Sequence, residues 1–227
     1  MYSCETNSMQ EWQERTEFNG NETNNLMEDV GIAISQETFD DANLETIAES
    51  VIDEFSLNRK QTVAFRLIIE NVLKRKRDED TEQKIVYIGG PGGTGKSQVI
   101  KAVVDFHDRI NLRVRLRLCA FTGTAAKHIG GNTITTLAGL RNSNISTLEK
   151  KWNGVNTVLL DEISMVGCRL LAKLSRNITC AKHNDPSVPF GGVDIFCFGD
   201  FTQFPPPACI RYTTILQLQQ RYIGTIN

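Results

Sequence analysis

The sequence lacks both a long apolar run and a closely spaced cysteine pair. None of its 227 residues belongs to a stretch near the roughly 18 consecutive apolar residues of a membrane span, and the first ten residues lack the basic-then-apolar order of a signal peptide. The six cysteines form no C-x-x-C pair. We therefore expect no membrane partner and no secretory leader. We also expect free thiols in a reducing compartment, with neither disulfide bridges nor a zinc site.

Aromatic residues and proline are also scarce. Aromatic residues make up 7% of the chain, and there are 6 prolines and 17 glycines, which excludes collagen-like and Pro/Gly-rich low-complexity proteins. Apolar residues make up 40% of the chain, enough for one buried core. Since the length corresponds to about one and a half ordinary domains, we expect one globular core and an additional segment.

Positive charge is almost missing from the first quarter of the chain. Residues 1–54 contain 14 acidic residues and one basic residue, Arg15, a net charge of -13, whereas residues 55–227 contain 13 acidic and 24 basic residues, a net charge of +11. Low hydrophobicity with charge of one sign predicts a disordered or marginally structured acidic arm over residues 1–54. The basic remainder suggests an anionic partner such as nucleic acid, with an ordinary solvated surface as the alternative.

From residue 57 onward, the apolar pattern predicts alternating helices and strands, which indicates an α/β fold with a parallel sheet and helices on both faces. Such sheets bind ligands beyond the carboxyl ends of their strands. One expected strand alternates with arginines, which favours an edge position or arginine stems that cover apolar surface. The expected helices cover residues 57–73, 97–107 and 168–178, and the expected strands cover residues 85–88, 114–118, 155–160 and 193–198.

A glycine-rich loop follows the first expected strand and precedes a helix. It reads G-P-G-G-T-G-K-S and fits the pattern G-x-x-x-x-G-K-[ST] at every fixed position. Its glycines let backbone N–H groups surround a phosphate, while Lys96 would neutralise the β- and γ-phosphates and Ser97 would bind Mg²⁺. A bland glycine turn is the alternative, which the flanking strand and helix disfavour. The residues expected to bind phosphate are Gly90, Gly92, Gly93, Thr94, Gly95, Lys96 and Ser97.

Two later strand ends also carry polar side chains. Asp161 and Glu162 follow an apolar strand, so Asp161 would join the Mg²⁺ shell and Glu162 would polarise the attacking water as a general base. An acidic helix N-cap is the alternative for Asp161. After the last expected strand, the segment G-D-F-T-Q-F-P-P contains Gln203, whose amide could contact a γ-phosphate and the attacking water. A Pro-terminated loop is the alternative there.

Together, these motifs resemble those of Pif1-type DNA helicases of superfamily 1. The amino-acid sequences of the motifs are most similar to those of the helicases carried by fungal Helitron transposons. The segment L-N-R-K-Q at residues 57–61 resembles the L-N-x-x-Q of that family, so the resemblance runs from about residue 57 to residue 221. The other matching segments are the glycine loop, F-T-G-T-A-A-K-H-I-G-G-N-T-I-T-T-L-A-G (121–139), D-E-I-S-M (161–165), P-F-G-G (189–192) and G-D-F-T-Q-F-P-P (199–206).

The resemblance implies a P-loop NTPase of RecA-like fold that uses ATP and Mg²⁺. It implies that Gln61 reads the adenine edge and that Gln203 couples the nucleotide to DNA. It also implies that Arg221, in L-Q-L-Q-Q-R, reaches the γ-phosphate and stabilises transition-state charge. A surface arginine is the alternative for Arg221.

Single-stranded DNA is the partner that the resemblance implies. Thr122, Gly123 and Thr124 match the segment that touches the DNA backbone, where hydroxyls and amides donate to phosphates. Phe121 and Thr135 stand where the family usually has Pro and His, so strand binding could differ at those two positions.

The implied activity is ATP-dependent, 5′-to-3′ DNA unwinding in repair, recombination and telomere maintenance, in the nucleus or the mitochondrion. Residues 55–227 correspond to the first RecA-like domain, and no residues correspond to the second. The main alternative is therefore a truncated, catalytically impaired remnant that binds ATP and DNA without unwinding. A small-molecule P-loop kinase is disfavoured by Gln61, F-T-G-T-A-A-K and G-D-F-T-Q together.

Overall fold

The computed structural model describes residues 41–77, 79, 81–139, 144–202 and 222–223. The chain divides into two units, Met1–Thr38 and Phe39–Asn227, and every described residue lies in the second. That unit contains a parallel sheet with the strand order β3-β2-β4-β5-β1-β6 among the described residues. The strands are Ile85–Gly89 (β1), Leu116–Ala120 (β2), Asn132–Thr133 (β3), Thr157–Asp161 (β4), Asp194–Gly199 (β5) and Tyr222–Ile223 (β6).

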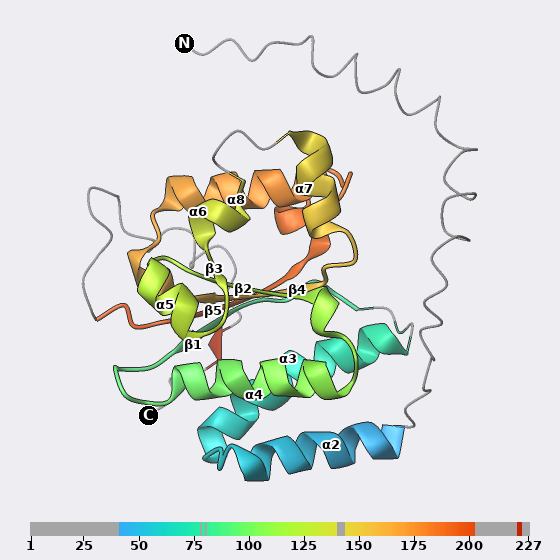
Figure 1. Cartoon of the computed structure of the whole chain (residues 1–227), viewed down its shortest axis with the longest axis vertical. Coiled ribbons are helices and arrows are strands. Elements are labelled where there is room, and N and C mark those ends of the chain that lie inside the picture. The colour runs from blue at the N-terminus through green and yellow to red at the C-terminus, as the bar shows by residue number, and fades with distance from the viewer. Residues whose placement is uncertain (1–40, 78, 80, 140–143, 203–221, 224–227) are drawn as a thin grey trace. The chain divides into compact units, whose positions relative to one another are not determined.

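Helices cover both faces of the sheet, as Figure 1 shows. Successive strand residues point to opposite faces, so Phe196 and Phe198 of β5 join one apolar core while Ile195 and Cys197 join the other. The predicted α/β fold is therefore confirmed. The helices on one face are α2 (Asp41–Glu54), α3 (Arg59–Lys76) and α4 (Lys96–Arg109), and those on the other are α6 (Ile134–Leu137), α7 (Ile145–Trp152) and α8 (Cys168–Ala181).

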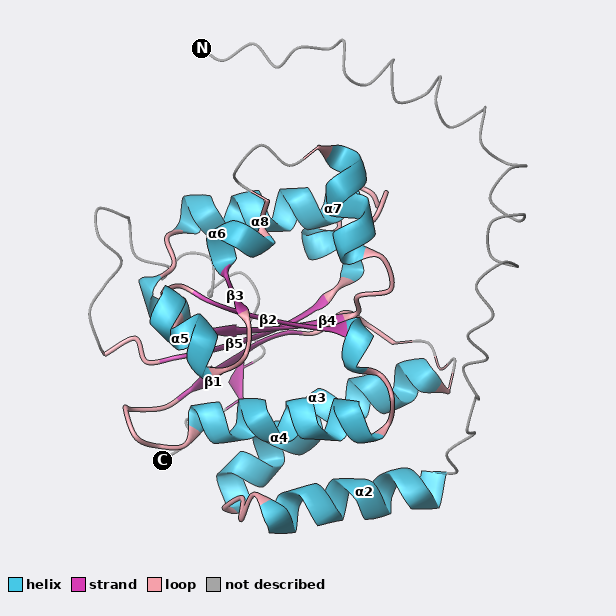
Figure 2. Cartoon of the chain, viewed as in Figure 1, coloured by secondary structure: helices cyan, strands magenta, loops and turns pink. Residues whose placement is uncertain are grey.

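Figure 2 shows the strands side by side between these two helical layers, with α5 (Gly123–His128) beside the sheet. The helices α4 and α8 and the strands β1 and β5 lie where the sequence predicts them, within three residues at each end. Helix α3 begins two residues later and ends three residues later than predicted, and Val63 on its outer face is 53% exposed.

Helix α2 corrects the predicted boundary of the acidic arm. Its residues belong to the segment 1–54, yet Leu44, Ala48 and Val51 are at most 1% exposed and lie in the same core as α3 and α4. These apolar residues recur at helical spacing, while acidic residues of the outer face pair with arginines of α3 and α4. The sequence shows this period only weakly over residues 44–52, and the acidic charge of the whole segment outweighed it in the prediction. Residues 1–40 lie outside the described residues.

The strand predicted over residues 114–118 begins two residues later than expected. Arg113–Arg115 form a 3₁₀ turn, which leaves Val114 72% exposed. Within β2, the guanidinium of Arg117 donates hydrogen bonds to backbone carbonyls, including that of Lys151 at 3.1 Å. The strand β2 pairs with β4 along its whole length but with β3 only at its last two residues. Most of β2 therefore lies at the edge of the sheet, close to the edge position that its arginines predicted.

The described part of the chain holds four free cysteines, Cys119, Cys168, Cys180 and Cys197. Burial raises the pKa of Cys197 to about 12, so this thiol stays protonated and unreactive. None of the described helices combines the length and apolar character that a membrane crossing requires.

Candidate active site

Three neighbouring strand ends bring three of the five predicted catalytic residues, Lys96, Asp161 and Glu162, to one edge of the sheet. The strand β1 leads into the glycine loop, β4 ends at Asp161, and β5 lies between them and is followed by Asp200. Because these strands are parallel, their carboxyl ends meet at one edge of the sheet. Burial raises the pKa of Asp161 and hydrogen bonds from Thr202 lower the pKa of Asp200, while the charge of Lys96, just after the loop, makes a minor lowering contribution to both. The three groups therefore lie near one another.

The glycine loop is held by the strand and helix beside it. The N–H of Gly90 donates to the carbonyl of Gly199 at 3.2 Å, and the hydroxyl of Thr94 donates to the carbonyl of Pro91 at 2.8 Å. Gly93 and Gly95 both have φ of +80°, a left-handed conformation that glycine adopts without steric cost. These contacts and backbone angles stabilise the loop conformation seen here.

Gln61 lies beside this loop, but its amide is engaged by the protein. Its Nε2 donates to the carbonyl of Thr94 at 3.0 Å, and its Oε1 accepts the N–H of Asn58 at 2.9 Å. The second bond is half of a capping box at the start of α3, in which the Asn58 side chain also caps the helix. The structure thus places Gln61 at the nucleotide loop, while its contact with an adenine remains a prediction.

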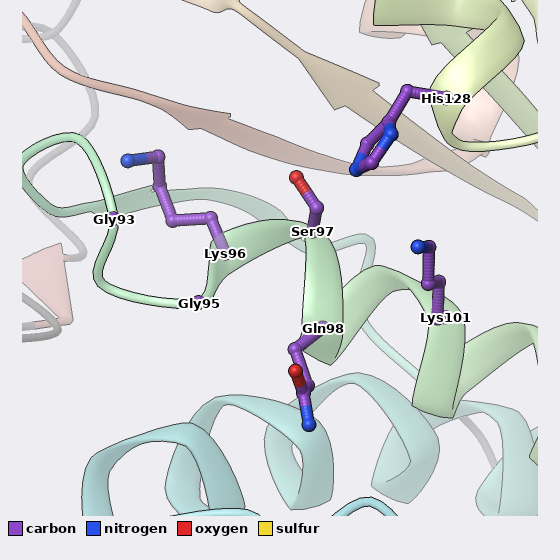
Figure 3. Close-up of a pocket in the computed structure, with 7 residues that line it drawn as sticks. All are labelled: Gly93, Gly95, Lys96, Ser97, Gln98, Lys101 and His128. Carbon is purple, nitrogen blue, oxygen red and sulfur yellow. The ribbon is translucent and has the colours of Figure 1, made fainter.

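Lys96 is the first residue of α4, and its side chain reaches back over the loop. Its Nζ donates to the carbonyls of Gly90 and Pro91 at 2.5 and 2.9 Å. In Figure 3 its side chain runs toward the part of the loop that holds Gly93. Two carbonyl oxygens offer an ammonium less stabilisation than a phosphate, so an incoming phosphate can take over this charge.

An open cavity of about 280 Å³ adjoins the loop and the first turns of α4. Figure 3 shows the hydroxyl of Ser97 and the ring of His128 directed into the same space, whereas Gln98 points the other way, where its amide donates to the carbonyl of Phe55 at 2.6 Å. The lining is polar and positively charged, which suits an anionic ligand. It comprises Gly93, Gly95, Lys96, Ser97, Gln98, Lys101 and His128.

Sequence reasoning missed three of these lining residues, Gln98, Lys101 and His128. Lys101 follows Ser97 by four positions and so lies on the same face of α4, a signal that could have identified it. His128 comes from the end of α5, and no local pattern places that short helix beside α4.

Asp161 is a buried carboxyl, with 7% of its surface exposed. Burial raises its pKa, and the nearby charge of Glu162 adds to this effect. Hydrogen bonding from the N–H of Glu162, at 2.9 Å, and the charges of Lys96 and His128 act in the opposite direction. A cation at this edge of the sheet would therefore favour the ionised form of Asp161.

Glu162 has an unusual backbone for a non-glycine residue. Its φ and ψ are 56° and 39°, the left-handed region, which costs a non-glycine residue about 1–3 kcal/mol. Its Oε2 accepts a hydrogen bond from the hydroxyl of Thr122 at 3.0 Å. The predicted general base and the predicted DNA-contacting segment are thus in direct contact.

The remaining predicted residues divide into two groups. Gly123 and Thr124 are exposed at the start of α5, while Gln203 and Arg221 lie outside the described residues.

For Mg²⁺, the available ligands are the Ser97 hydroxyl and the Asp161 carboxylate. These hard oxygen donors fit an ion that takes one or two protein ligands and completes its shell with phosphate and water. The described residues contain no cluster of three or more His, Cys, Asp or Glu that would form a separate metal site.

Comparison with known proteins gives one consistent result. A family model described as PIF1-like helicase matches residues 56–213. Among curated proteins, the chain is 32% identical over 152 residues to the ATP-dependent DNA helicase RRM3 of Saccharomyces cerevisiae, covering 62% of this chain and 20% of the relative. It is 30% identical over 181 residues to the ATP-dependent DNA helicase PIF1 of Trypanosoma brucei brucei, covering 77% and 18%. The chain thus spans about a fifth of these relatives.

Solved structures agree with this result. The chain superposes on the Pif1 helicase from Candida albicans with a TM-score of 0.56 and 27% identity, covering 75% of this chain and 39% of that one. It also superposes on Bacteroides Pif1 bound to ssDNA with a TM-score of 0.53 and 25% identity, covering 71% and 36%.

Proposed function

Because the chain belongs to the PIF1-like helicase family, we propose that its folded unit is the first RecA-like motor domain of an ATP-dependent DNA helicase. The observation that carries the proposal is the convergence of Lys96, Asp161 and Glu162 at one edge of the sheet, beside a cavity with a positively charged lining. The named activity of the relatives, ATP-dependent DNA unwinding, supplies the reaction that such a site serves.

Phosphate binding begins with an exchange of partners at Lys96. The ammonium leaves the carbonyls of Gly90 and Pro91 and pairs with the β- and γ-phosphates of ATP, while the N–H groups of the loop donate to the same oxygens. Lys101 adds positive charge at the rim of the cavity. The adenine lies toward α3, where Gln61 gives up its bond to Thr94 to read the purine edge.

Ser97 and Asp161 would hold Mg²⁺, which when bound offsets the negative charge on the phosphate oxygens. Glu162 acts on the water. Its carboxylate accepts a proton as the water oxygen forms a bond to the γ-phosphorus, and the bond between that phosphorus and the β–γ bridging oxygen breaks. The products are ADP and inorganic phosphate. We propose that Arg221 stabilises the negative charge on the γ-phosphate in the transition state. Gln203 would couple the state of the nucleotide to DNA binding.

Single-stranded DNA is the proposed track. A Bacteroides relative at 25% identity has been solved with ssDNA, and in this chain Thr122, Gly123 and Thr124 present hydroxyls and amides beside the nucleotide site. We propose 5′-to-3′ movement and a role in DNA repair, recombination and telomere maintenance, in the nucleus or, as the second choice, the mitochondrion.

Steady-state ATP hydrolysis, measured with and without excess oligo(dT), tests the proposal. We expect turnover that DNA stimulates and that Lys96→Ala abolishes, because the phosphates lose their main counter-charge. The matched control is Lys60→Ala, an exposed lysine of α3, which should keep wild-type turnover. Wild-type ATP affinity in the Lys96→Ala variant would contradict the site assignment. Tight ATP binding without turnover in the wild-type chain would favour a nucleotide-binding remnant.

A further inference from the structure

One hydrogen bond joins the proposed DNA-contacting segment to the proposed general base. The hydroxyl of Thr122 donates to Oε2 of Glu162 at 3.0 Å. These residues follow the ends of β2 and β4, which pair in parallel with Ala120 opposite Asp161. The bond therefore connects two adjacent strand ends, 40 residues apart in the sequence, and does not depend on a long flexible loop.

The only proton of the Thr122 hydroxyl is already donated in this arrangement. A threonine hydroxyl carries one proton, which here goes to Glu162, and its oxygen accepts the N–H of Ala125 at 3.1 Å. A DNA phosphate can only accept hydrogen bonds. Thr122 therefore cannot donate to Glu162 and to a phosphate through the same proton, and the two acceptors compete.

The Glu162 side chain is equally constrained. Its backbone is left-handed, so the direction in which the side chain leaves the strand end is set by a conformation that the surroundings must maintain. With Oε2 bound to Thr122, one carboxylate oxygen faces the start of α5.

We propose that Thr122 holds Glu162 in an unproductive position, and that single-stranded DNA releases it by taking over the threonine hydroxyl. This inference rests on the proposed function, since it assigns DNA dependence to that ATPase site. DNA phosphate on Thr122 leaves the Glu162 carboxylate free to turn toward the attacking water and accept its proton. Thr122 is thus a positioning residue. Its hydroxyl binds either Glu162 or a DNA phosphate, and this choice couples DNA binding to ATP hydrolysis.

A binding cycle tests the coupling without requiring turnover. In the full chain, Glu162→Gly removes the competing acceptor and keeps the left-handed backbone at no cost. We expect it to tighten fluorescein-labelled oligo(dT) binding about three- to tenfold, since competing ligands weaken each other reciprocally. Repeating the substitution together with T122V should give a much smaller gain, because valine has no hydroxyl to release. Equal gains in both backgrounds would overturn the proposal and leave only the lost negative charge as the cause.

Turnover provides the second readout. We expect T122V to raise ATP hydrolysis without DNA severalfold and to flatten the response to oligo(dT), whereas T122S, which keeps a hydroxyl, should behave like the wild-type chain. Adding Glu162→Gln to T122V should abolish the raised rate. Thermal unfolding of each variant separates these effects from loss of the α5 cap. A T122V rate without DNA at or below that of a folded wild-type chain would contradict the proposal.

The outcomes distinguish this inference from the function on which it rests. If wild-type chain binds neither ATP nor oligo(dT), the proposed function fails, and the switch fails with it. If the wild-type chain binds both, and oligo(dT) affinity shows no coupling between positions 122 and 162, the proposed function stands and the switch alone is wrong.

Discussion

At the scale of single residues, Gly95 and Gly93 have the same backbone angle but different surroundings. Both have φ of +80°. A Cβ on Gly95 would lie 2.1 Å from Nε2 of Gln61, whereas a Cβ on Gly93 would meet no atom within 4 Å. The left-handed conformation costs an alanine about 1–2 kcal/mol at either position. Only at position 95 must a neighbouring side chain also move.

We therefore expect Gly95→Ala to lower the free energy of unfolding by about 1 kcal/mol more than Gly93→Ala. The added methyl group displaces the Gln61 amide from the carbonyl of Thr94, and a net hydrogen bond is worth about 1 kcal/mol. Denaturant unfolding of the two variants measures this difference. Equal losses would show that Gln61 moves aside freely and does not support the loop.

His107 gives the protein a pH dependence that is independent of the active site. Burial lowers the pKa of this α4 histidine to about 4, while an unfolded histidine has a pKa of about 6.5. Between these values the unfolded chain binds the extra proton, so stability rises with pH in that window and is lost as the pH falls through it. His107 is 1% exposed, and its Nδ1 lies 2.7 Å from the carbonyl of Val103.

From this shift we expect the free energy of unfolding to fall by about 2–3 kcal/mol between pH 7 and pH 4 through His107. His107→Gln, which cannot titrate, should remove that part of the slope. Denaturant titrations at several pH values provide the measurement. An unchanged slope in the variant would show that other groups dominate the acid response.

At the scale of secondary-structure elements, α2 belongs to the core although its segment is acidic. Val51 of α2 is 0% exposed, while Val63 of α3 is 53% exposed. Two arginines hold the outer face of α2: Arg66 binds Glu45 at 2.7 Å, and Arg109 binds Glu54 at 2.6 Å. Such exposed pairs contribute little, so the buried face is the main source of the stability of α2.

Val51→Ala should therefore lower the free energy of unfolding by about 2 kcal/mol, because it removes two buried methyl groups and leaves a cavity. Val63→Ala is the matched control and should change stability by less than about 0.5 kcal/mol. Chemical denaturation compares the two. A small effect at position 51 would mean that α2 contributes little to the folded unit.

The sequence predicted the elements whose signals are local. The glycine loop, Lys96 and α4 follow one another along the chain, so one motif and one helical period were enough to place them. The bond between Thr122 and Glu162 was not predictable, because it depends on the register between β2 and β4. His128 is a similar case, since its place in the cavity follows from the packing of α5. Helix α2 was missed because the acidic charge of the 54-residue segment was given more weight than the weak apolar period over residues 44–52.

At the scale of the whole molecule, the uneven charge has a testable effect on DNA binding. Residues 1–38 contain eight acidic residues and one basic residue, a net charge of -7, so their removal changes the formal charge of the chain from -2 to +5. This cut also ends before α2, which begins at Asp41, and so preserves the buried face of that helix.

We expect deletion of residues 1–38 to tighten binding to oligo(dT) several-fold at low ionic strength, since repulsion between the acidic segment and the DNA phosphates is removed. The advantage should shrink as salt is added, because screening shortens the reach of charge. Fluorescence anisotropy across a salt series measures both effects. Identical affinities at every salt concentration would exclude this role for the acidic segment.

The position of β5 between β1 and β4 also bears on how the protein folds. During synthesis, β1 and β4 emerge well before β5, yet neither pairs with the other, so the strand that joins them is the last of the three to appear. Parallel pairings between strands far apart in sequence form slowly. Until Asp194–Gly199 has inserted, the glycine loop and the two carboxylates belong to separate pieces of chain. We therefore expect the nucleotide site to form only after β5 has inserted between β1 and β4.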